Sequence, residues 1–305
     1  MNTALEIFCT VAKHGSMSRA AAELHLSQPA ISQRLRALEE QYGLPLFRRT
    51  NRGVELTPAG ETLSRYAQRI LRLERSLQEE MESLRAEEPR QIVVGATSAI
   101  GGYALPCTVY LFQQKYPRTR IHLQIGKRSE VIQRLEDGLV GMALVEGPAV
   151  EPRAVAHDWQ VSVISEEDLV LITPATGPIA AQERFTADDL CRLPLIVREQ
   201  GSGGRLAVEE AWRAAGRQPS DLNIAMELTS VDAIKTSVAA GHGVALVSKW
   251  CVRAEARMGH LRIAPLEGIR FTSSWTLLYP RSGMRSTVER ALLRTLRSPA
   301  ERGFC

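Results

Sequence analysis

The sequence predicts a multidomain protein: an N-terminal all-α unit with a small β-hairpin wing, a long linker helix, and a C-terminal α/β domain of two subdomains. Three observations lead to this prediction. Short helical patterns separated by tight turns fill most of the first 58 residues. A heptad pattern of apolar residues follows them. From residue 91 onward, short apolar runs alternate with amphipathic helical patterns, as in α/β domains.

The length and composition limit the classes of protein to which the chain can belong. Its 305 residues, 44% hydrophobic and 24% charged, suit two or three globular domains. No apolar run reaches the ~18 to 20 residues of a membrane-spanning helix, and the N-terminus lacks the pattern of a signal peptide. We therefore expect a cytoplasmic protein without a membrane partner. The five cysteines are scattered, so we expect no disulfide scaffold, and Cys9 and Cys107 are expected to be core thiols.

Three helices are predicted in the first 43 residues. Thr3-x-x-Glu6 is a capping-box pattern that opens the first helix. Ser18 can cap a second helix, and His25-Leu26 form the turn after it. Ser27 can cap a third helix, which carries a proline in its first turn. Two short helices, a tight turn and a third helix make a helix-turn-helix.

The third predicted helix has two different faces. Ile31, Leu35 and Leu38 share one face and are expected to enter a small core. The opposite face and the N-terminal tip offer groups that can contact base edges or phosphates in a major groove. The candidate DNA-contacting residues there are Ser27, Gln28, Pro29, Ser32, Gln33 and Arg36. Taken alone, this face could equally be an ordinary solvated surface, which is the commoner reason for such residues on a helix.

The following segment favours DNA binding. Two strand-like runs, 46–50 and 54–57, flank Asn51-Arg52-Gly53, whose asparagine and glycine suit a tight turn. The resulting wing carries Arg48, Arg49 and Arg52, which can contact the DNA backbone or enter a minor groove. These arginines beside a recognition helix predict a winged helix-turn-helix.

A long linker helix is predicted after the wing, with Thr57 as its cap and Pro58 in its first turn. Apolar residues recur every seven positions at Leu63, Ile70, Leu77 and Leu84. A helix packed on its own domain would show a similar stripe, but the length of the seam favours a dimer. A two-fold dimer would present two recognition helices to a roughly palindromic double-stranded DNA site.

The C-terminal domain is predicted from alternating strands and helices, which indicate parallel sheets covered by helices. The expected strands are 92–96, 121–125, 142–145, 169–173, 195–197, 224–227, 244–247 and 275–279, and the expected helices are 103–116, 129–138, 205–215, 231–240 and 286–296. We place the DNA-binding unit at 1–58, the linker at 59–89 and the C-terminal domain at 90–298, divided into subdomain I (90–162 and 268–298) and subdomain II (163–267).

A ligand cleft is expected between the two subdomains, because ligands of open α/β sheets bind beyond the carboxyl ends of strands. Four loops follow such ends, and each alone is more simply a helix cap. Their candidate ligand-binding residues are Thr97, Ser98, Ile100, Gly101, Arg128, Ser129, Arg198, Ser202, Gly203, Thr229 and Ser230. Together with Lys127, Arg205 and Lys235 they predict cations that converge on one cleft and bind a small anion.

No motif indicates catalysis. The six histidines show no metal-ligand spacing, and neither a Gly-x-Ser-x-Gly elbow nor a Walker loop is present. Residues 201–204 do not match the dinucleotide-binding fingerprint. We therefore expect no enzyme activity, no metal and no cofactor.

The N-terminal motifs resemble the LysR-type transcriptional regulators over about the first 60 residues. The resemblance lies in Phe8-x-x-Val11-Ala12, Gly15-Ser16-x-Ser18-x-Ala20-Ala21, Leu24-x-Leu26-Ser27-Gln28-Pro29-Ala30-Ile31-Ser32, Leu38-Glu39, Gly43-x-Pro45-Leu46-Phe47-x-Arg49 and Leu56-Thr57-x-Ala59-Gly60. It implies base contacts from Gln28, Pro29, Ser32 and Gln33, and a place near the minor groove for Arg52.

The same resemblance extends to the C-terminal domain, which is similar to the periplasmic-binding-protein-like effector domain of that family. It implies effector contacts at Thr97, Ser98, Ser129 and Ser202. The stretch from Arg198 to Arg205 looks like the Arg-Glu-x-Gly-Ser-Gly-x-Arg segment of a branch that includes sulfur and carbon-fixation regulators. Gly204 stands where that branch usually has threonine, and Lys127-Arg128 stand where small polar residues are usual.

The predicted function is therefore a sequence-specific DNA-binding transcriptional regulator controlled by a small, anionic effector. We expect a homodimer through the linker helix and further assembly to a homotetramer, with RNA polymerase as another candidate partner. The alternative is a solute-binding module without a direct transcriptional role.

Overall fold

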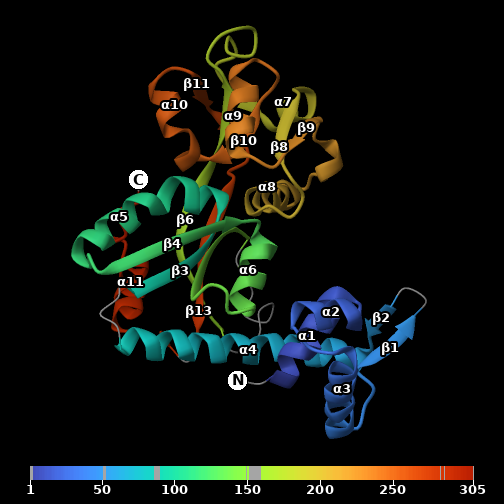
Figure 1. Ribbon diagram of the computed structural model, residues 1–305. Coiled ribbons are helices and arrows are strands. Elements are labelled where there is room, and N and C mark those ends of the chain that lie inside the picture. Colours follow the sequence, from blue (N-terminus) through green and yellow to red (C-terminus); the bar gives the residue numbers. More distant parts are fainter. Residues whose placement is uncertain are drawn as a thin grey trace. The chain divides into compact units, whose positions relative to one another are not determined.

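The computed structural model describes residues 3–50, 53–85, 90–148, 150, 159–281, 283–284 and 286–304. The chain divides into two compact units, Met1–Glu88 and Pro89–Cys305 (Figure 1). None of the described helices is long and apolar enough to cross a membrane.

The first unit has the predicted winged helix-turn-helix. Its helices are α1 (Thr3–His14), α2 (Met17–Glu23) and α3 (Gln28–Tyr42), and its wing pairs β1 (Phe47–Thr50) with β2 (Gly53–Leu56) antiparallel. Ser27 caps α3 as expected, since its Oγ accepts a hydrogen bond from the Ala30 N–H. The predicted cap of α2 was wrong: Ser16, not Ser18, accepts from the Arg19 N–H, so that helix begins earlier.

The core of this unit forms from the apolar face of α3. Ile31, Leu35 and Leu38 are buried and pack with Phe8 and Val11 of α1. Removing these side chains from water stabilises the unit by roughly 1.5–3 kcal/mol each. The burial of this face confirms the predicted orientation of α3.

Helix α4 (Pro58–Arg85) is the linker helix. Thr57 caps it, with its Oγ1 accepting from the Gly60 N–H at 3.0 Å. Ala67 is fully buried against the winged unit, and Leu63 packs beside it. Leu63 therefore belongs partly to the core of its own unit, whereas Ile70 and Leu77 of the predicted seam are exposed. The side chain of Leu84 lies outside the described residues.

The second unit begins with a parallel βαβ arrangement. Strands β3 (Arg90–Thr97), β4 (Thr119–Gly126) and β5 (Met142–Gly147) pair in parallel. The π-helix η1 (Ile100–Ala104) runs into α5 (Leu105–Lys115), and α6 (Arg128–Glu136) connects β4 to β5. Helix α11 (Thr287–Arg297) packs its buried face, including Leu292 and Leu296, into the core of this half.

Two long strands connect this half to the second one. Strand β6 (Trp159–Pro174) and strand β13 (Thr272–Pro280) lie side by side and antiparallel, and the sheet order is β10-β6-β13-β5-β3-β4 (Figure 1). The expectation of purely parallel sheets was wrong, because β13 runs antiparallel to β5. A chain that returns along an antiparallel strand needs no crossover helix. Only 169–173 of β6 was predicted, since the residues before it alternate apolar with polar side chains and end in the acidic run Glu166-Glu167-Asp168.

The second half has its own core around Trp212, Phe185 and Leu195. Its elements are β7 (Phe185–Thr186), α7 (Ala187–Arg192), β8 (Leu195–Arg198), α8 (Gly203–Ala214), η3 (Pro219–Asp221), β9 (Ile224–Leu228), α9 (Val231–Ala239), β10 (Ala245–Ser248), η4 (Lys249–Val252), α10 (Arg253–Arg257), β11 (Leu261–Ala264) and β12 (Leu266–Glu267). Strands β8 and β9 are parallel, as predicted. Strands β10 and β11 instead pair antiparallel with β6.

The C-terminal residues extend the core beyond the helix that the sequence predicted. Arg302 is buried and donates a hydrogen bond to the Ile164 carbonyl at 2.6 Å. The ring of Phe304 lies 5.0 Å from that of Trp275. The prediction of a core thiol was wrong for Cys107, which is disulfide-bonded. Cys9, Cys191 and Cys251 form no disulfide.

Candidate DNA-binding face and ligand cleft

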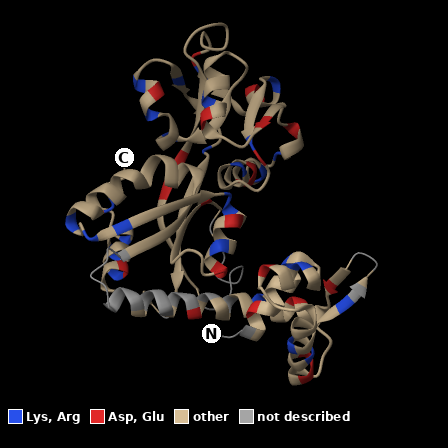
Figure 2. Ribbon diagram, viewed as in Figure 1, with Lys and Arg blue, Asp and Glu red and all other residues tan. Residues whose placement is uncertain are grey.

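The polar face of α3 is accessible within its own unit. Ser27, Gln28, Pro29, Gln33 and Arg36 are exposed. Ser32 is half-buried. Figure 2 shows basic residues on α3 and on the wing strand β1. Because the apolar face of α3 is fixed in the core, these side chains project from a rigid element, as a major-groove contact requires.

The wing is held against the end of α1. The Val54 N–H donates to the Gly15 carbonyl at 2.9 Å. A Cβ at Gly53, which has φ +133°, would lie 2.2 Å from the same carbonyl oxygen, so only glycine allows this approach. Arg48 is exposed but pairs with Glu55 across the hairpin at 2.9 Å. The side chain of Arg49 and the whole of Arg52 lie outside the described residues.

The two halves of the second unit meet where β5 ends and α8 begins. Gly203 is the first residue of α8, and a Cβ there would lie 2.1 Å from the carbonyl oxygen of Glu146 and 2.5 Å from its Cγ. Gly147 adopts φ +118°, and a Cβ on it would lie 2.9 Å from the Cα of Gly203. Both backbones therefore approach each other as closely as glycine permits.

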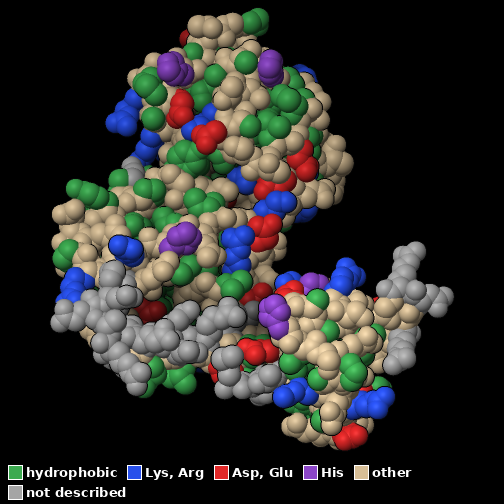
Figure 3. Space-filling model, in the orientation of Figure 1, with side chains coloured by type: hydrophobic (Ala, Val, Ile, Leu, Met, Phe, Trp, Pro, Cys, Tyr) green, Lys and Arg blue, Asp and Glu red, His purple; other side chains and the backbone are tan. Residues whose placement is uncertain are grey.

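Several predicted ligand-binding residues meet at this junction. The Glu146 N–H donates to the Thr97 Oγ1 at 3.1 Å. Arg128 donates to the carbonyls of Glu146 and Pro148 at 2.6 and 2.7 Å. Ser202, the N-cap of α8, is buried, and its Oγ has no hydrogen-bond partner among the described residues. In Figure 3, acidic and basic side chains gather where the two halves meet.

The helices that follow Thr97 and Ser230, η1 and α9, also contact each other. Tyr103 donates a hydrogen bond from its Oη to Asp232 on α9 at 2.7 Å. Its ring lies 4.7 Å from the Lys235 Nζ. Thr229 and Ser230 are exposed just before this helix, and the Ser230 Oγ accepts from the Ala233 N–H.

Four other predicted residues have different surroundings. The side chain of Ile100 is fully buried in the core of the first half. A Cβ at Gly101 would lie 2.9 Å from Ile125, so that glycine serves close packing of η1 on the sheet. Ser129 is exposed and lines a shallow surface hollow on α6 with Glu130 and Arg134. Ser98 is half-buried.

Three of the cations expected at the cleft are paired with carboxylates of the protein. Arg198 is buried and pairs with Glu199 at 2.8 Å. Arg205 pairs with Glu209 at 2.8 Å and with Glu227 at 2.5 Å. Lys235 pairs with Asp232 at 2.9 Å and Glu255 at 2.6 Å. The pairs with Glu199, Glu209 and Asp232 are local in sequence. The pairs with Glu227 and Glu255 could not be predicted from spacing, because those residues come from elements that only the fold brings close.

Two buried carboxyl groups beside the junction were not predicted from the sequence. Burial raises the pKa of Glu146 to about 7, although the charges of Arg198 and Arg128 act in the opposite direction. Burial also raises the pKa of Glu167 to about 8, and the nearby charge of Glu146 adds to the effect. The Glu167 carboxyl accepts a hydrogen bond from the Trp275 Nε1 at 2.6 Å and another from the Ser248 Oγ. The glutamate at the end of the apolar run 142–145 was the available sequence signal for Glu146.

These pKa values predict a pH-dependent stability. The folded state holds protons at Glu167 and Glu146 that the unfolded chain has released, so the free energy of unfolding should fall as the pH rises from about 4.5 to about 8. Glu167→Gln should make this fall shallower while leaving an acceptor for Trp275. Urea unfolding across that pH range measures the effect. Glu166→Gln, at an exposed neighbour, is the control, and equal slopes in both variants would contradict the prediction.

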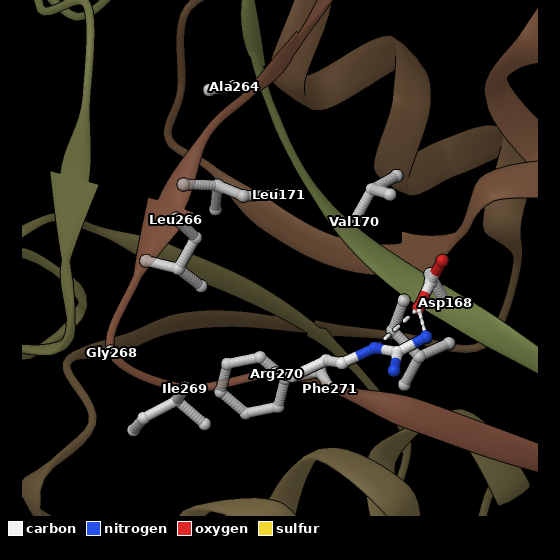
Figure 4. Close-up of a pocket in the computed structure, with 10 residues that line it drawn as sticks. Asp168, Val170, Leu171, Ala264, Leu266, Gly268, Ile269, Arg270 and Phe271 are labelled. Atoms are coloured by element: carbon white, nitrogen blue, oxygen red, sulfur yellow. Dashed lines mark hydrogen bonds and ion pairs between the residues drawn. The ribbon is translucent and has the colours of Figure 1, made fainter.

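A larger hollow of about 540 Å³ lies elsewhere, between β6 and the segment 264–271 (Figure 4). Leu171, Leu266 and Phe271 contribute apolar walls, and Arg270 pairs with Asp168 at 2.9 Å. None of the predicted ligand-binding residues lines it. It is therefore distinct from the junction around Glu146.

Comparisons with known proteins are consistent along the whole chain. Residues 3–61 match the model of the bacterial regulatory helix-turn-helix protein, lysR family, and residues 85–300 match the LysR substrate binding domain. The RuBisCO operon transcriptional regulator of Allochromatium vinosum is 31% identical over 301 residues, which is 99% of this chain and 97% of that protein. The HTH-type transcriptional activator CmpR of Synechocystis sp. is 31% identical over 94% of this chain and 92% of its own length.

Solved structures share the fold. CbnR in complex with its target DNA aligns with a TM-score of 0.69 at 22% identity, over 97% of this chain and 98% of that one. The Synechocystis CcmR regulatory domain in complex with 2-PG aligns with a TM-score of 0.58 at 22% identity, over 68% of this chain and 95% of that one.

Proposed function

Because this chain belongs to the LysR family of bacterial transcriptional regulators, we propose that α3 and the wing bind its operator and that the junction at Ser202 binds a small acidic effector. The protein is a DNA-binding regulator with a small-molecule-binding domain. The proposal adds the residues that make each contact and the chemical class of the effector. It also places the protein in the cytoplasm, where its operator and RNA polymerase, a further proposed partner, are found.

The observation that supports the effector site is the buried Ser202 hydroxyl at the start of α8. The free N–H groups and the positive end of this helix dipole favour an anionic group. The Ser202 hydroxyl can donate to such a group, and Arg128 provides a cation held nearby by two carbonyls. The structure of CcmR with 2-PG supports a small molecule as the effector class in this fold.

The DNA-binding function is tested by affinity selection from fragmented genomic DNA with the purified full-length protein. We expect enrichment of a few fragments that share a roughly palindromic motif, bound more weakly as the salt concentration rises. Selection without enrichment would instead favour the alternative, a solute-binding module without a direct transcriptional role.

We also propose a homodimer through α4, with a homotetramer as the further assembly. Large apolar side chains of this helix are exposed within their own unit: Tyr66, Ile70, Leu73, Leu77 and Met81. A partner helix that covers this stripe would remove it from water.

Leu77→Asp should therefore break the dimer, because it would bury an unpaired carboxylate in the seam. Light scattering should show a mass near the 33.7 kDa of one chain, against at least twice that for the unmodified protein. Gln68→Asp, at an exposed polar position of the same helix, should leave the mass unchanged. An unchanged mass for Leu77→Asp would rule out this seam.

A further inference from the structure

Glu146 is a buried carboxylate that is fixed in place. It ends the buried strand β5, is 4% exposed, and lies directly beneath the first residue of α8. Its N–H donates a hydrogen bond to the Thr97 Oγ1, and its carbonyl accepts one from Arg128. The backbone of Glu146 is thus fixed at the junction between the two halves.

The carboxylate of Glu146 accepts no hydrogen bond from any residue in the described part of the chain, although its backbone is fully bonded. Arg198 and Arg128 lie close enough for their charges to act on its pKa, but neither donates a hydrogen bond to it. Arg198 makes two hydrogen bonds to Glu199, at 2.8 and 3.1 Å, and Arg128 is bonded to two carbonyls. Glu167 differs, because Trp275 and Ser248 donate to it. A carboxylate that is 4% exposed and has no donor in the described part of the chain is free to accept a hydrogen bond from a ligand.

A second polar group without a partner lies next to it. The Ser202 Oγ is buried at the N-terminus of α8, and the following residue, Gly203, touches Glu146. The two groups have opposite preferences. With a pKa of about 7, Glu146 is partly ionised at neutral pH, and a nearby N–H or O–H donor would favour the ionised form, which only accepts hydrogen bonds. A hydroxyl at a helix N-terminus instead suits an anion. One molecule that satisfies both must carry an acidic group and, close to it, an N–H or O–H donor.

We propose that Glu146 is the specificity-determining residue of this cleft and that the effector is a small acid with a hydroxyl or ammonium donor beside its acidic group. The acidic group lies at Ser202 and the start of α8, and the donor bonds to Glu146. This inference rests on the proposed function, which places the effector at Ser202 but requires only an acid. An acid without the donor leaves Glu146 buried and unpaired, so it binds more weakly.

The test uses two matched series of acids that differ in one substituent: propionate, lactate and alanine, then succinate, malate and aspartate. Thermal shift and calorimetry on the full-length protein measure binding. We expect at least one donor-bearing acid to bind about 10-fold or more tightly than its donor-free counterpart. The hydroxyl and ammonium members of each series distinguish the two donors.

Glu146→Met removes the acceptor with similar side-chain length, and should abolish the preference for the donor-bearing acid. Glu146→Gln should weaken an ammonium ligand more than a hydroxyl ligand, since it keeps an acceptor without the charge. Glu183→Gln, at an exposed position in the second half, is the control and should retain the preference.

Three results would overturn the inference. The donor-free acids could bind as tightly as the donor-bearing acids of the same series. That result would overturn the role of the donor but would not contradict the proposed acid site at Ser202. Glu146→Met could fold, bind acids and keep the preference, which would remove the assigned role of Glu146. Finally, all six acids could fail to bind while genomic selection still enriches an operator. That result would reject this effector class and leave the DNA-binding function intact.

Discussion

Gly203→Ala should destabilise the second unit and disturb its ligand cleft. The new methyl group would lie 2.1 Å from the Glu146 carbonyl oxygen and 2.5 Å from its Cγ. The oxygen belongs to a buried strand and already accepts a hydrogen bond from Arg128, so it cannot yield by a rotamer change. Either α8 moves away from β5 or the strand shifts. Overpacking of this kind costs about 1–3 kcal/mol.

Gly204→Ala provides a matched control one residue later. A Cβ at that position meets nothing within 4 Å, and alanine favours a helix more than glycine does. We expect this variant to be neutral or slightly stabilised. The unfolding temperature of the second unit, followed by calorimetry, should fall by roughly 2–10 °C for Gly203→Ala alone. Equal melting temperatures in the two variants would mean that the close approach at the junction is not required.

The elements that the sequence predicted well are those whose signals are local. The cap at Ser27 and the spacing of Ile31, Leu35 and Leu38 lie within a few turns of one helix, and the structure confirms both. The alternation of apolar runs with helices likewise predicted most of β3 to β5. Such patterns depend on residues that are near in sequence, so they can be recognised without knowledge of the fold.

The parts that could not be predicted depend on long-range contacts. The first half of β6 forms because β13, about a hundred residues later in sequence, pairs with it. The ion pair between Arg205 and Glu227 and the position of Glu146 beneath Gly203 arise the same way. Sequence patterns therefore indicated loops that meet at the junction of the two halves, but not the pairing of Arg205 with Glu227 or the presence of the Glu146 carboxylate there.

Replacing Gln33 with alanine should cost about 1–3 kcal/mol in operator binding, roughly a 5- to 150-fold loss of affinity. Gln33 is exposed on α3, and its neighbours Ile31 and Leu35 are fixed in the core. Its amide can make two hydrogen bonds to one base, so its loss should relax the sequence preference at that base. Arg36→Ala should instead weaken binding to all sequences and reduce the salt dependence by about one phosphate contact.

Fluorescence anisotropy on the selected operator and on a shuffled duplex separates these two effects at several salt concentrations. Gln41→Ala, exposed near the far end of α3, controls for changes in helix stability. Because both side chains project from a helix anchored by Ile31 and Leu35, their removal should leave the fold of the unit intact. If both variants bound the operator as tightly as Gln41→Ala, the polar face of α3 would be a solvated surface, and the DNA contacts would have to come from elsewhere in the unit.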